Sequence, residues 1–276
     1  MKLNSAIPFY SYRIETPAIT DVGRKILLDV MGTKPKFVTN RIPLKTSFFD
    51  SSVKVATPTI GALLGDKLST IGPTTIGRHL NDSRNGLEYA KHFHDINNLK
   101  ESDFRMKECA EAFHEAVDIQ SKVRNREFTL DECVQDLVFT CQVASLPQQI
   151  GEKITEKLPS KARARAHSEL RILRDGLQRC RPFLARQVNY TWDDLRRYAA
   201  QTALIAEVVN RNVREDKAKA VLEVDSTANR RQISELLKDI ELLSNEKRWF
   251  IEPSEIGNFP QILSLWHNYF FLEEII

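Results

Sequence analysis

Two charged residues in the N-terminal part of the sequence have mostly apolar neighbours, and a charge in such a place requires a partner or access to solvent. Asp29 interrupts the run Ile26-Leu27-Leu28-Asp29-Val30, and Lys67 interrupts Leu63-Leu64-Gly65-Asp66-Lys67-Leu68. Because a buried unpaired carboxylate is costly, Asp29 needs a cation, a salt bridge or a position at the rim of its strand. An ammonium group on a flexible stem suits a phosphate, which makes Lys67 a candidate phosphate ligand. A solvent-facing aspartate at a strand end and a solvated helical lysine are the alternatives.

A second pair of charges follows in Tyr89-Ala90-Lys91-His92-Phe93-His94-Asp95-Ile96. Lys91 and Asp95 are four residues apart, so on a helix they share one face and could bind a ligand together or form an exposed ion pair of little energetic weight. His92 and His94 are two residues apart and point in different directions on a helix, so with Asp95 they make a poor metal site.

These segments, in this order, resemble the closing half of the active site in the AbiEii/AbiGii type nucleotidyltransferases, whose members include bacterial toxins of toxin-antitoxin and phage-defence systems. The match runs from the Lys67 segment to Lys91 and Asp95 and continues through Ile96 and Leu99. The resemblance implies a polymerase-β-like mixed sheet, Mg²⁺ and an NTP. It makes Asp29 a metal-side or general-base carboxylate, Lys67 a phosphate contact, and Lys91 with Asp95 the closure on the nucleotide side.

The resemblance also implies an activity: transfer of a nucleoside monophosphate from NTP to RNA, tRNA included, or to a protein hydroxyl, under the restraint of a cognate antitoxin. The family's opening Gly-Ser turn and Asp-x-Asp strand have no counterpart, because no Gly-Ser pair occurs and only 28 residues precede Asp29. We therefore expect the chain to be a shortened form of a longer enzyme, one half of a split enzyme completed by an N-terminal polypeptide, or a catalytically incomplete protein that binds RNA or protein.

The glycines near Lys67 do not form the phosphate-binding loop (P-loop) of other nucleotide-binding proteins. Gly61 and Gly65 precede Lys67, but the GxxxxGK[ST] spacing of a phosphate-binding loop is absent.

The pattern of the chain changes near residue 100. Before it, β-branched and aromatic runs at 9–14, 25–30, 42–49 and 52–56 predict strands of a mixed sheet. After it, Met106, Ala110, Phe113 and Val117 predict a helix starting near residues 102–103. The fold class expected is α+β: a partial nucleotidyltransferase-like α/β domain at 1–100, followed by a helical bundle at 101–276.

Several later helices have recognisable starts and apolar stripes. Thr129 with Glu132, and Thr191 with Asp194, have the spacing of N-terminal capping residues. Residues 233–243 carry a clean apolar stripe, and the tail from Trp249 predicts a loop followed by a short aromatic helix that packs back on the bundle.

A local excess of positive charge marks the helical half. Residues 153–197 contain twelve Lys or Arg against five Asp or Glu. The basic side chains that could follow a phosphate backbone, and so bind RNA, are Lys161, Arg163, Arg165, Arg171 and Arg174. A solvated helix surface, with arginine stems covering apolar patches, explains the same pattern.

Composition excludes other classes. With 276 residues, 42% hydrophobic, 28% charged and a net charge of +3, the chain is expected to be globular, and no apolar run of about 18 residues or signal-type core predicts a membrane or a secreted protein. We expect the cytoplasm. The four cysteines are never closer than eight positions, which favours reduced core thiols over a metal or redox pair.

Overall fold

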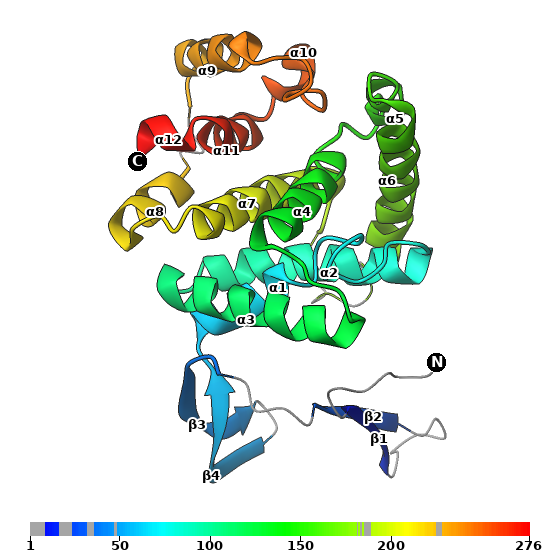
Figure 1. Cartoon of the computed structure of the whole chain (residues 1–276), viewed down its shortest axis with the longest axis vertical. Helices are drawn as coiled ribbons and strands as arrows, with labels where there is room; N and C mark the ends of the chain where they lie inside the picture. The colour runs from blue at the N-terminus through cyan, green and yellow to red at the C-terminus, as the bar shows by residue number, and fades with distance from the viewer. Residues whose placement is uncertain are drawn as a thin grey trace.

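The computed structural model describes residues 9–16, 24–31, 36–46, 49–180, 182, 184, 189–224 and 228–276. The described chain is largely helical with a small amount of antiparallel sheet near the N-terminus, so the α+β class is confirmed. Figure 1 shows two strand hairpins below α1 and α3, with the remaining helices stacked above them.

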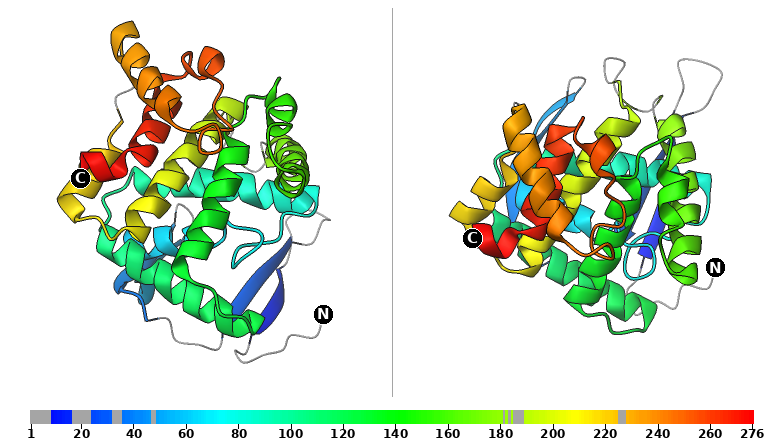
Figure 2. Two further views of the ribbon diagram at one scale, coloured as in Figure 1. Left: turned by 45° about the horizontal axis from the view of Figure 1, so that its top comes forward. Right: turned by 90° about the horizontal axis from the view of Figure 1, so that it is seen from above.

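The described strands form two separate two-stranded sheets. β1 (Phe9–Thr16) pairs with β2 (Arg24–Met31), and β3 (Thr39–Thr46) pairs with β4 (Phe49–Pro58), both antiparallel. Figure 2 shows the hairpins apart from each other in two further views. The mixed sheet was therefore wrong for the described strands, because each strand pairs with its neighbour in sequence and no crossover sets two of them parallel.

Twelve helices occupy the described residues from 60 onwards. They are α1 (Ile60–Leu68), α2 (Ser83–Lys100), α3 (Met106–Arg124), α4 (Leu130–Ala144), α5 (Gly151–Thr155), α6 (Ser160–Cys180), α7 (Trp192–Asn210), α8 (Glu215–Leu222), α9 (Arg230–Leu242), α10 (Pro253–Ile256), α11 (Pro260–Phe270) and α12 (Leu272–Ile275). None of the described helices has the length and apolar character needed to cross a membrane.

A single hydrophobic core runs through these helices. It extends from Leu64 in α1 to Leu272 in α12 and contains the four cysteines, which are buried and free as expected. The helices on either side of residue 100 share it, since α2 packs against both α6 and α7. The division into domains at 1–100 and 101–276 stays a prediction.

The sequence located the starts of α4 and α7 correctly. Thr129 with Glu132, and Thr191 with Asp194, form the expected reciprocal caps of α4 and α7. The start of α3 was placed too early: the helix begins at Met106, where the Glu215 carboxylate of α8 accepts a hydrogen bond of 2.8 Å from the Met106 backbone N–H. No local side chain caps α3; instead Glu215, which is 109 residues away in the sequence, satisfies this free N–H group.

Glycines set the closest helix crossings. A Cβ atom built on Gly65 of α1 would lie 2.1 Å from the carbonyl oxygen of Cys109 in α3, and one on Gly176 of α6 would lie 2.0 Å from the carbonyl carbon of Gly86 in α2. Only a residue without a side chain allows these backbones to approach so closely. Gly61 and Gly65 thus have a packing role, consistent with their failure to form a phosphate-binding loop.

We expect Gly65→Ala to lower the free energy of unfolding by about 2–3 kcal/mol, because the added methyl group meets backbone rather than a movable side chain. Chemical denaturation followed by circular dichroism measures the change. Gly257→Ala is the matched control, because its Cβ would have no neighbour nearer than 3.5 Å. Equal stability of the two variants would contradict the crossing constraint.

Candidate functional site

Lys67 and Asp95 meet across 28 residues of sequence. The Lys67 Nζ of α1 lies 2.8 Å from the Asp95 Oδ2 of α2, and the two side chains remain 29% and 42% exposed. The expected convergence of these two residues therefore occurs. Each charge is neutralised by the other, yet both stay within reach of a ligand in solvent.

Lys91 takes a different partner from the one its spacing suggests. Its Nζ lies 3.4 Å from the Glu88 Oε2, three residues earlier on α2, whereas Asp95 binds Lys67. The Lys91 to Asp95 ion pair allowed by the sequence is thus absent, because the nearer ammonium of α1 competes for the carboxylate. Lys91 and Glu88 still lie on the same helix as Asp95 and add one charge of each sign beside it.

His92 is the least solvated member of this group. Burial, and after it the positive charge of Lys67, lowers the pKa of the His92 imidazole to about 4. Its Nδ1 atom is buried and has no hydrogen-bond partner among the described residues. His92 is therefore neutral at pH 7, and the cationic groups of the Lys67–Asp95 cluster, defined as Lys67, Glu88, Lys91, His92 and Asp95, are its two lysines.

The loop between α1 and α2 is held by a buried carboxylate. Asp136 of α4 accepts hydrogen bonds of 2.7–2.8 Å from the backbone N–H and hydroxyl groups of both Thr74 and Thr75. Arg124 of α3 donates to the carbonyl oxygens of Thr75, Ile76 and Gly77. Side chains of α3 and α4 thus bind both backbone N–H groups and backbone carbonyl oxygens of this loop, and these contacts hold the loop in place.

Asp29 lies in the middle of β2, with Ser11 of β1 as its cross-strand partner. The structure describes its backbone, while its side chain lies outside the described part. Its assigned part in the site stays a prediction.

Five basic residues of α6 divide into two groups. Arg165 turns inward, with its Nη2 2.5 Å from the Asp136 Oδ1 and its Nε 2.6 Å from the Glu169 Oε1. Arg174 pairs with Glu152 at 3.0 Å. These three ion pairs tie α6 to α4, to α5 and to itself, so the guanidinium groups of Arg165 and Arg174 are committed to the fold.

The other three basic residues of α6 are exposed. Lys161 and Arg171 form no ion pair with a described residue, and Arg163 donates to the Leu158 carbonyl oxygen at 2.9 and 3.2 Å. Arg163 and Arg171 line one side of a shallow groove that His167 shares. Of the five basic residues proposed to bind RNA, Lys161, Arg163 and Arg171 are thus exposed, and RNA binding stays a prediction.

A Mg²⁺ site is not complete in the described chain. Within the described residues no group of three or more His, Cys, Asp or Glu side chains is arranged to hold a metal ion, and Asp95 is already paired with Lys67. Three or more oxygen ligands from the protein or substrate normally surround Mg²⁺. The described residues therefore do not fit the ion by themselves.

Several residues that build the cluster were missed from sequence. Asp136 and Arg124 carry no local signal, because each acts on a loop about 50 or more residues away. Glu88 could have been found, since it lies three residues before Lys91 on the same helix face.

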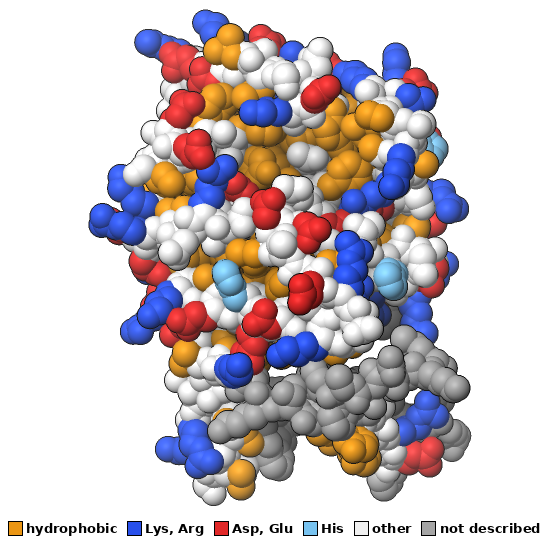
Figure 3. Space-filling model, viewed as in Figure 1, with side chains coloured by type: hydrophobic (Ala, Val, Ile, Leu, Met, Phe, Trp, Pro, Cys, Tyr) orange, Lys and Arg blue, Asp and Glu red, His pale blue; other side chains and the backbone are white. Residues whose placement is uncertain are grey.

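Comparison with known proteins adds no identity. No protein-family model, curated protein or solved structure matches this chain. On the face drawn in Figure 3, basic and acidic side chains are interspersed, and no single sign of charge covers it. The candidate site thus depends on its own geometry.

We expect His92 to make the fold sensitive to acid. Because the folded chain holds His92 neutral down to about pH 4 and an unfolded histidine protonates near 6.5, unfolding takes up a proton in this window. The free energy of unfolding should fall as pH drops from 6.5 to 4, by roughly 2 kcal/mol from this group. Denaturation of His92→Gln at several pH values should show a flatter profile.

His114→Gln is the control, since His114 is exposed on α3. A His92→Gln profile as steep as that of the control would show that His92 is protonated equally in both states.

Proposed function

We propose that this chain is a nucleotidyltransferase-like toxin of the AbiEii/AbiGii type, acting in a toxin-antitoxin or phage-defence system. It moves a nucleoside monophosphate from an NTP onto RNA, with tRNA as the first candidate, or onto a protein hydroxyl. The 2.8 Å contact between Lys67 and Asp95 carries the proposal, because it joins two motif fragments that the resemblance assigns to one nucleotide site.

Lys67 is suited to bind a phosphate in that site. Its ion pair with Asp95 is about one-third exposed, and such pairs contribute roughly 0–1 kcal/mol, so a triphosphate can displace the carboxylate at low cost. The neutral His92 beside it adds no positive charge of its own to the local field. Lys67 therefore orients the phosphates, and Lys91 lies on the next helix to add a second positive charge.

The transfer is a displacement at the α-phosphorus. The acceptor hydroxyl oxygen bonds to the α-phosphorus, the bond from that phosphorus to the bridging oxygen breaks, and pyrophosphate leaves. The hydroxyl proton passes to a carboxylate, one of the two roles that the resemblance allows for Asp29. If Asp29 is instead a metal-side carboxylate, further carboxylates from a completing segment would be needed to hold Mg²⁺ with it.

The β1–β2 hairpin supports a completing segment. One face of it exposes Tyr10, Tyr12 and Ile14 of β1, which are 46–54% exposed, beside Leu28 and Val30 of β2. An isolated two-stranded hairpin with an apolar face is marginal in water and gains stability from further strands or a covering element. A preceding segment or complementing N-terminal polypeptide could supply that cover with the remaining carboxylates, and a cognate antitoxin is another candidate partner.

A second function is favoured by one observation. The exposed Lys161, Arg163 and Arg171 of α6 could hold a phosphate backbone without any catalysis. The alternative is therefore a catalytically incomplete nucleotidyltransferase-fold protein that binds RNA or protein.

The enzyme proposal predicts label transfer. Purified chain, alone and with the polypeptide encoded beside it, is incubated with labelled NTPs, Mg²⁺ and tRNA. We expect transfer in at least one arm and a loss of about 100-fold or more in Lys67→Met, because a phosphate contact is removed. Lys217→Met, which changes an exposed lysine of α8, should keep full activity.

Absence of transfer in both arms would remove the enzyme proposal. Since Lys67 and Asp95 are partly exposed, Lys67→Met should fold, and its unchanged melting temperature would separate lost chemistry from lost structure.

The RNA proposal predicts a salt effect. Lys161→Glu with Arg171→Glu should weaken tRNA binding at least tenfold and reduce the slope of log K against log salt by about 1.4–1.8, since two phosphate contacts are lost. Lys217→Glu with Lys238→Glu makes the same charge change on exposed residues of α8 and α9. Fluorescence anisotropy with labelled tRNA measures both, and equal binding by the two double variants would contradict an RNA surface on α6.

A further inference from the structure

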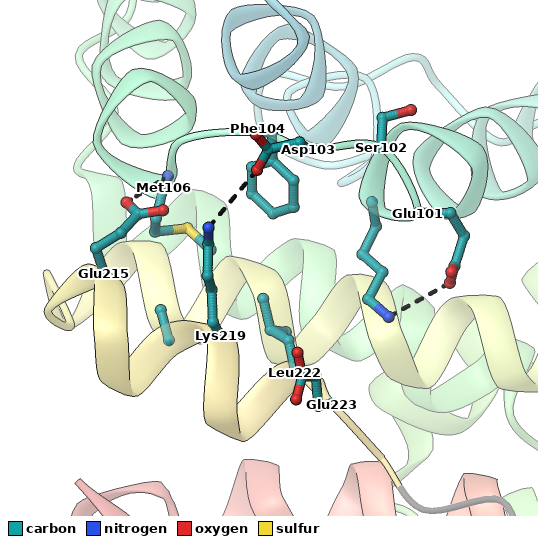
Figure 4. Close-up of a pocket in the computed structure, with 11 residues that line it drawn as sticks. Glu101, Ser102, Asp103, Phe104, Met106, Glu215, Lys219, Leu222 and Glu223 are labelled. Carbon is teal, nitrogen blue, oxygen red and sulfur yellow. Dashed lines mark hydrogen bonds and ion pairs between the residues drawn. The ribbon is translucent and has the colours of Figure 1, made fainter.

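The groove beside α8 is lined by charged side chains that largely bind one another. Figure 4 shows Lys219, whose Nζ lies 3.6 Å from an Asp103 carboxylate oxygen, and Lys100, whose Nζ lies 3.3 Å from that of Glu101. Glu215, at the same groove, caps α3. These contacts leave few charges of the groove free for a ligand. Unpaired charge and unpaired backbone are found instead on the β3–β4 hairpin.

The β3–β4 hairpin projects from the helical body with its side chains in solvent. Figure 1 shows it below α1 and α3. At its base the Thr59 backbone N–H donates to the Val38 carbonyl oxygen at 3.1 Å, beside the start of α1. Beyond this base Ile42, Val53 and Val55 are 45%, 61% and 38% exposed. Two strands alone are marginal in water, so the hairpin would gain stability from further strands.

The two outer edges of this hairpin differ. The sheet consists of β3 and β4, so each has one edge that pairs with no strand of the described chain. Pro43 lies within β3, and a strand tolerates proline where the missing N–H would face away from its partner. The outer edge of β3 is thus protected against a further strand. Since β4 has proline only at its last residue, Pro58, its edge is the one suited to pairing.

The backbone of β4 is incompletely paired within the hairpin. The register shifts between Pro43 and Lys45 of β3, and Ser51, Ser52 and Val53 of β4 have no partner in it. The Val53 N–H donates to the Ser51 hydroxyl at 3.1 Å, a local substitute for a bond between strands. Exposed backbone groups of this kind are those that an added strand would bind.

The charges of β4 lie on one face of the hairpin. Lys54 is opposite Pro43 and Asp50 is opposite Lys45. Because Pro43 and Lys45 are two residues apart on β3, they share a face, and so do the residues opposite them. Lys54 and Asp50 therefore lie on the same face, four residues apart in the sequence.

This spacing makes β4 complementary to a second copy of itself. In an antiparallel pair of two β4 strands centred on Ser52, each Asp50 lies opposite the Lys54 of the other copy. A two-fold axis forms this contact twice. Opposite charges directly across a strand pair stabilise it, and like charges destabilise it. Pairing centred on Lys54 would bring two ammonium groups together, so the charges also favour one register over another.

Both charges are available for this contact. Lys54 is exposed and forms no ion pair with any residue in the described part of the chain. Asp50 lies 3.0 Å from Lys45, but the two side chains are 69% and 68% exposed. Such an exposed pair is weak, and a carboxylate can accept from several donors, so Asp50 can bind a second ammonium group.

We propose that β4 pairs with β4 of a second copy of this chain, and that the two hairpins form one antiparallel four-stranded sheet in the order β3–β4–β4–β3. The exposed apolar side chains then belong to a sheet with enough strands to be stable. Because the contact is one strand wide, the dimer is weak and depends on concentration. The surface contains no residue of the Lys67–Asp95 cluster, and the proposal does not depend on the transferase proposal.

Sedimentation velocity of the purified chain over a wide range of concentration tests for the dimer. We expect a reversible equilibrium of monomer and dimer. Lys54→Asp should raise the dissociation constant about tenfold or more, because it sets like charges opposite each other at two positions. Arg41→Asp is the matched control, since it makes the same charge change at an exposed residue of β3 on the same face. It should dimerise as the unaltered chain does.

A mixing experiment separates the contact from damage to the hairpin. Asp50→Lys should also be monomeric by itself, for the same reason as Lys54→Asp. A mixture of the two variants should form a heterodimer, because the variant with only positive charges at both positions then faces the variant with only negative charges. Misfolding of either variant cannot produce this recovery.

A cross-link tests the register. In the proposed pairing Ser52 faces Ser52 of the second copy at a Cα separation of about 4.5–5.5 Å, within disulfide range. The four native cysteines are buried, so Ser52→Cys under mild oxidation should give a covalent dimer on a non-reducing gel. Ala56→Cys is the control, because its two thiols would lie eight residues, or about 27 Å, apart along the strands.

Four results would overturn the proposal: a chain that stays monomeric at every concentration, a dimer that Lys54→Asp and Arg41→Asp affect equally, a mixture that fails to associate, or equal cross-linking of the two cysteine variants. Lys67→Met should dimerise as the unaltered chain does, so loss of transferase activity and loss of the dimer are measured independently.

Discussion

The close approach of helices at glycine is the constraint on which the described structure depends. Gly65 lets α1 lie against α3, and Gly86 with Gly176 lets α2 lie against α6, at distances where any Cβ would overlap backbone. Since α1 carries Lys67 and α2 carries Asp95, these crossings fix the two helices that present the paired charges. Closely packed backbones cannot shift far without steric overlap. The position of the site therefore follows from helix packing rather than from the partly exposed ion pair.

Buried ion pairs decide which basic residues remain available. The Arg165 guanidinium forms ion pairs with Asp136 and Glu169, and Asp136 also binds the loop that follows α1. A buried carboxylate that accepts several hydrogen bonds must be fully satisfied, which leaves little freedom for its partners. Of the basic residues of α6, Arg165 and Arg174 therefore stabilise the fold, whereas Lys161, Arg163 and Arg171 remain exposed.

Helix α2 joins the candidate site to the helical core. Asp95 faces α1, where it pairs with Lys67, and the same helix packs against α6 and α7. Because the partly exposed ion pair contributes little energy, the position of Asp95 depends on these packed faces of α2.

The sequence by itself determined the α+β class, the approximate positions of the strands, the capping boxes of α4 and α7 and the burial of the cysteines, because these follow from local periodicity and side-chain chemistry. It also indicated Lys67 and Asp95, although not their direct contact. Only the tertiary structure decided that the strands pair as separate hairpins, that Glu215 caps α3, and that Asp136 holds the loop after α1. Strand pairing, caps from distant residues and loop contacts depend on residues far apart in the chain. The separation of two such residues in the sequence does not indicate how close they lie in space.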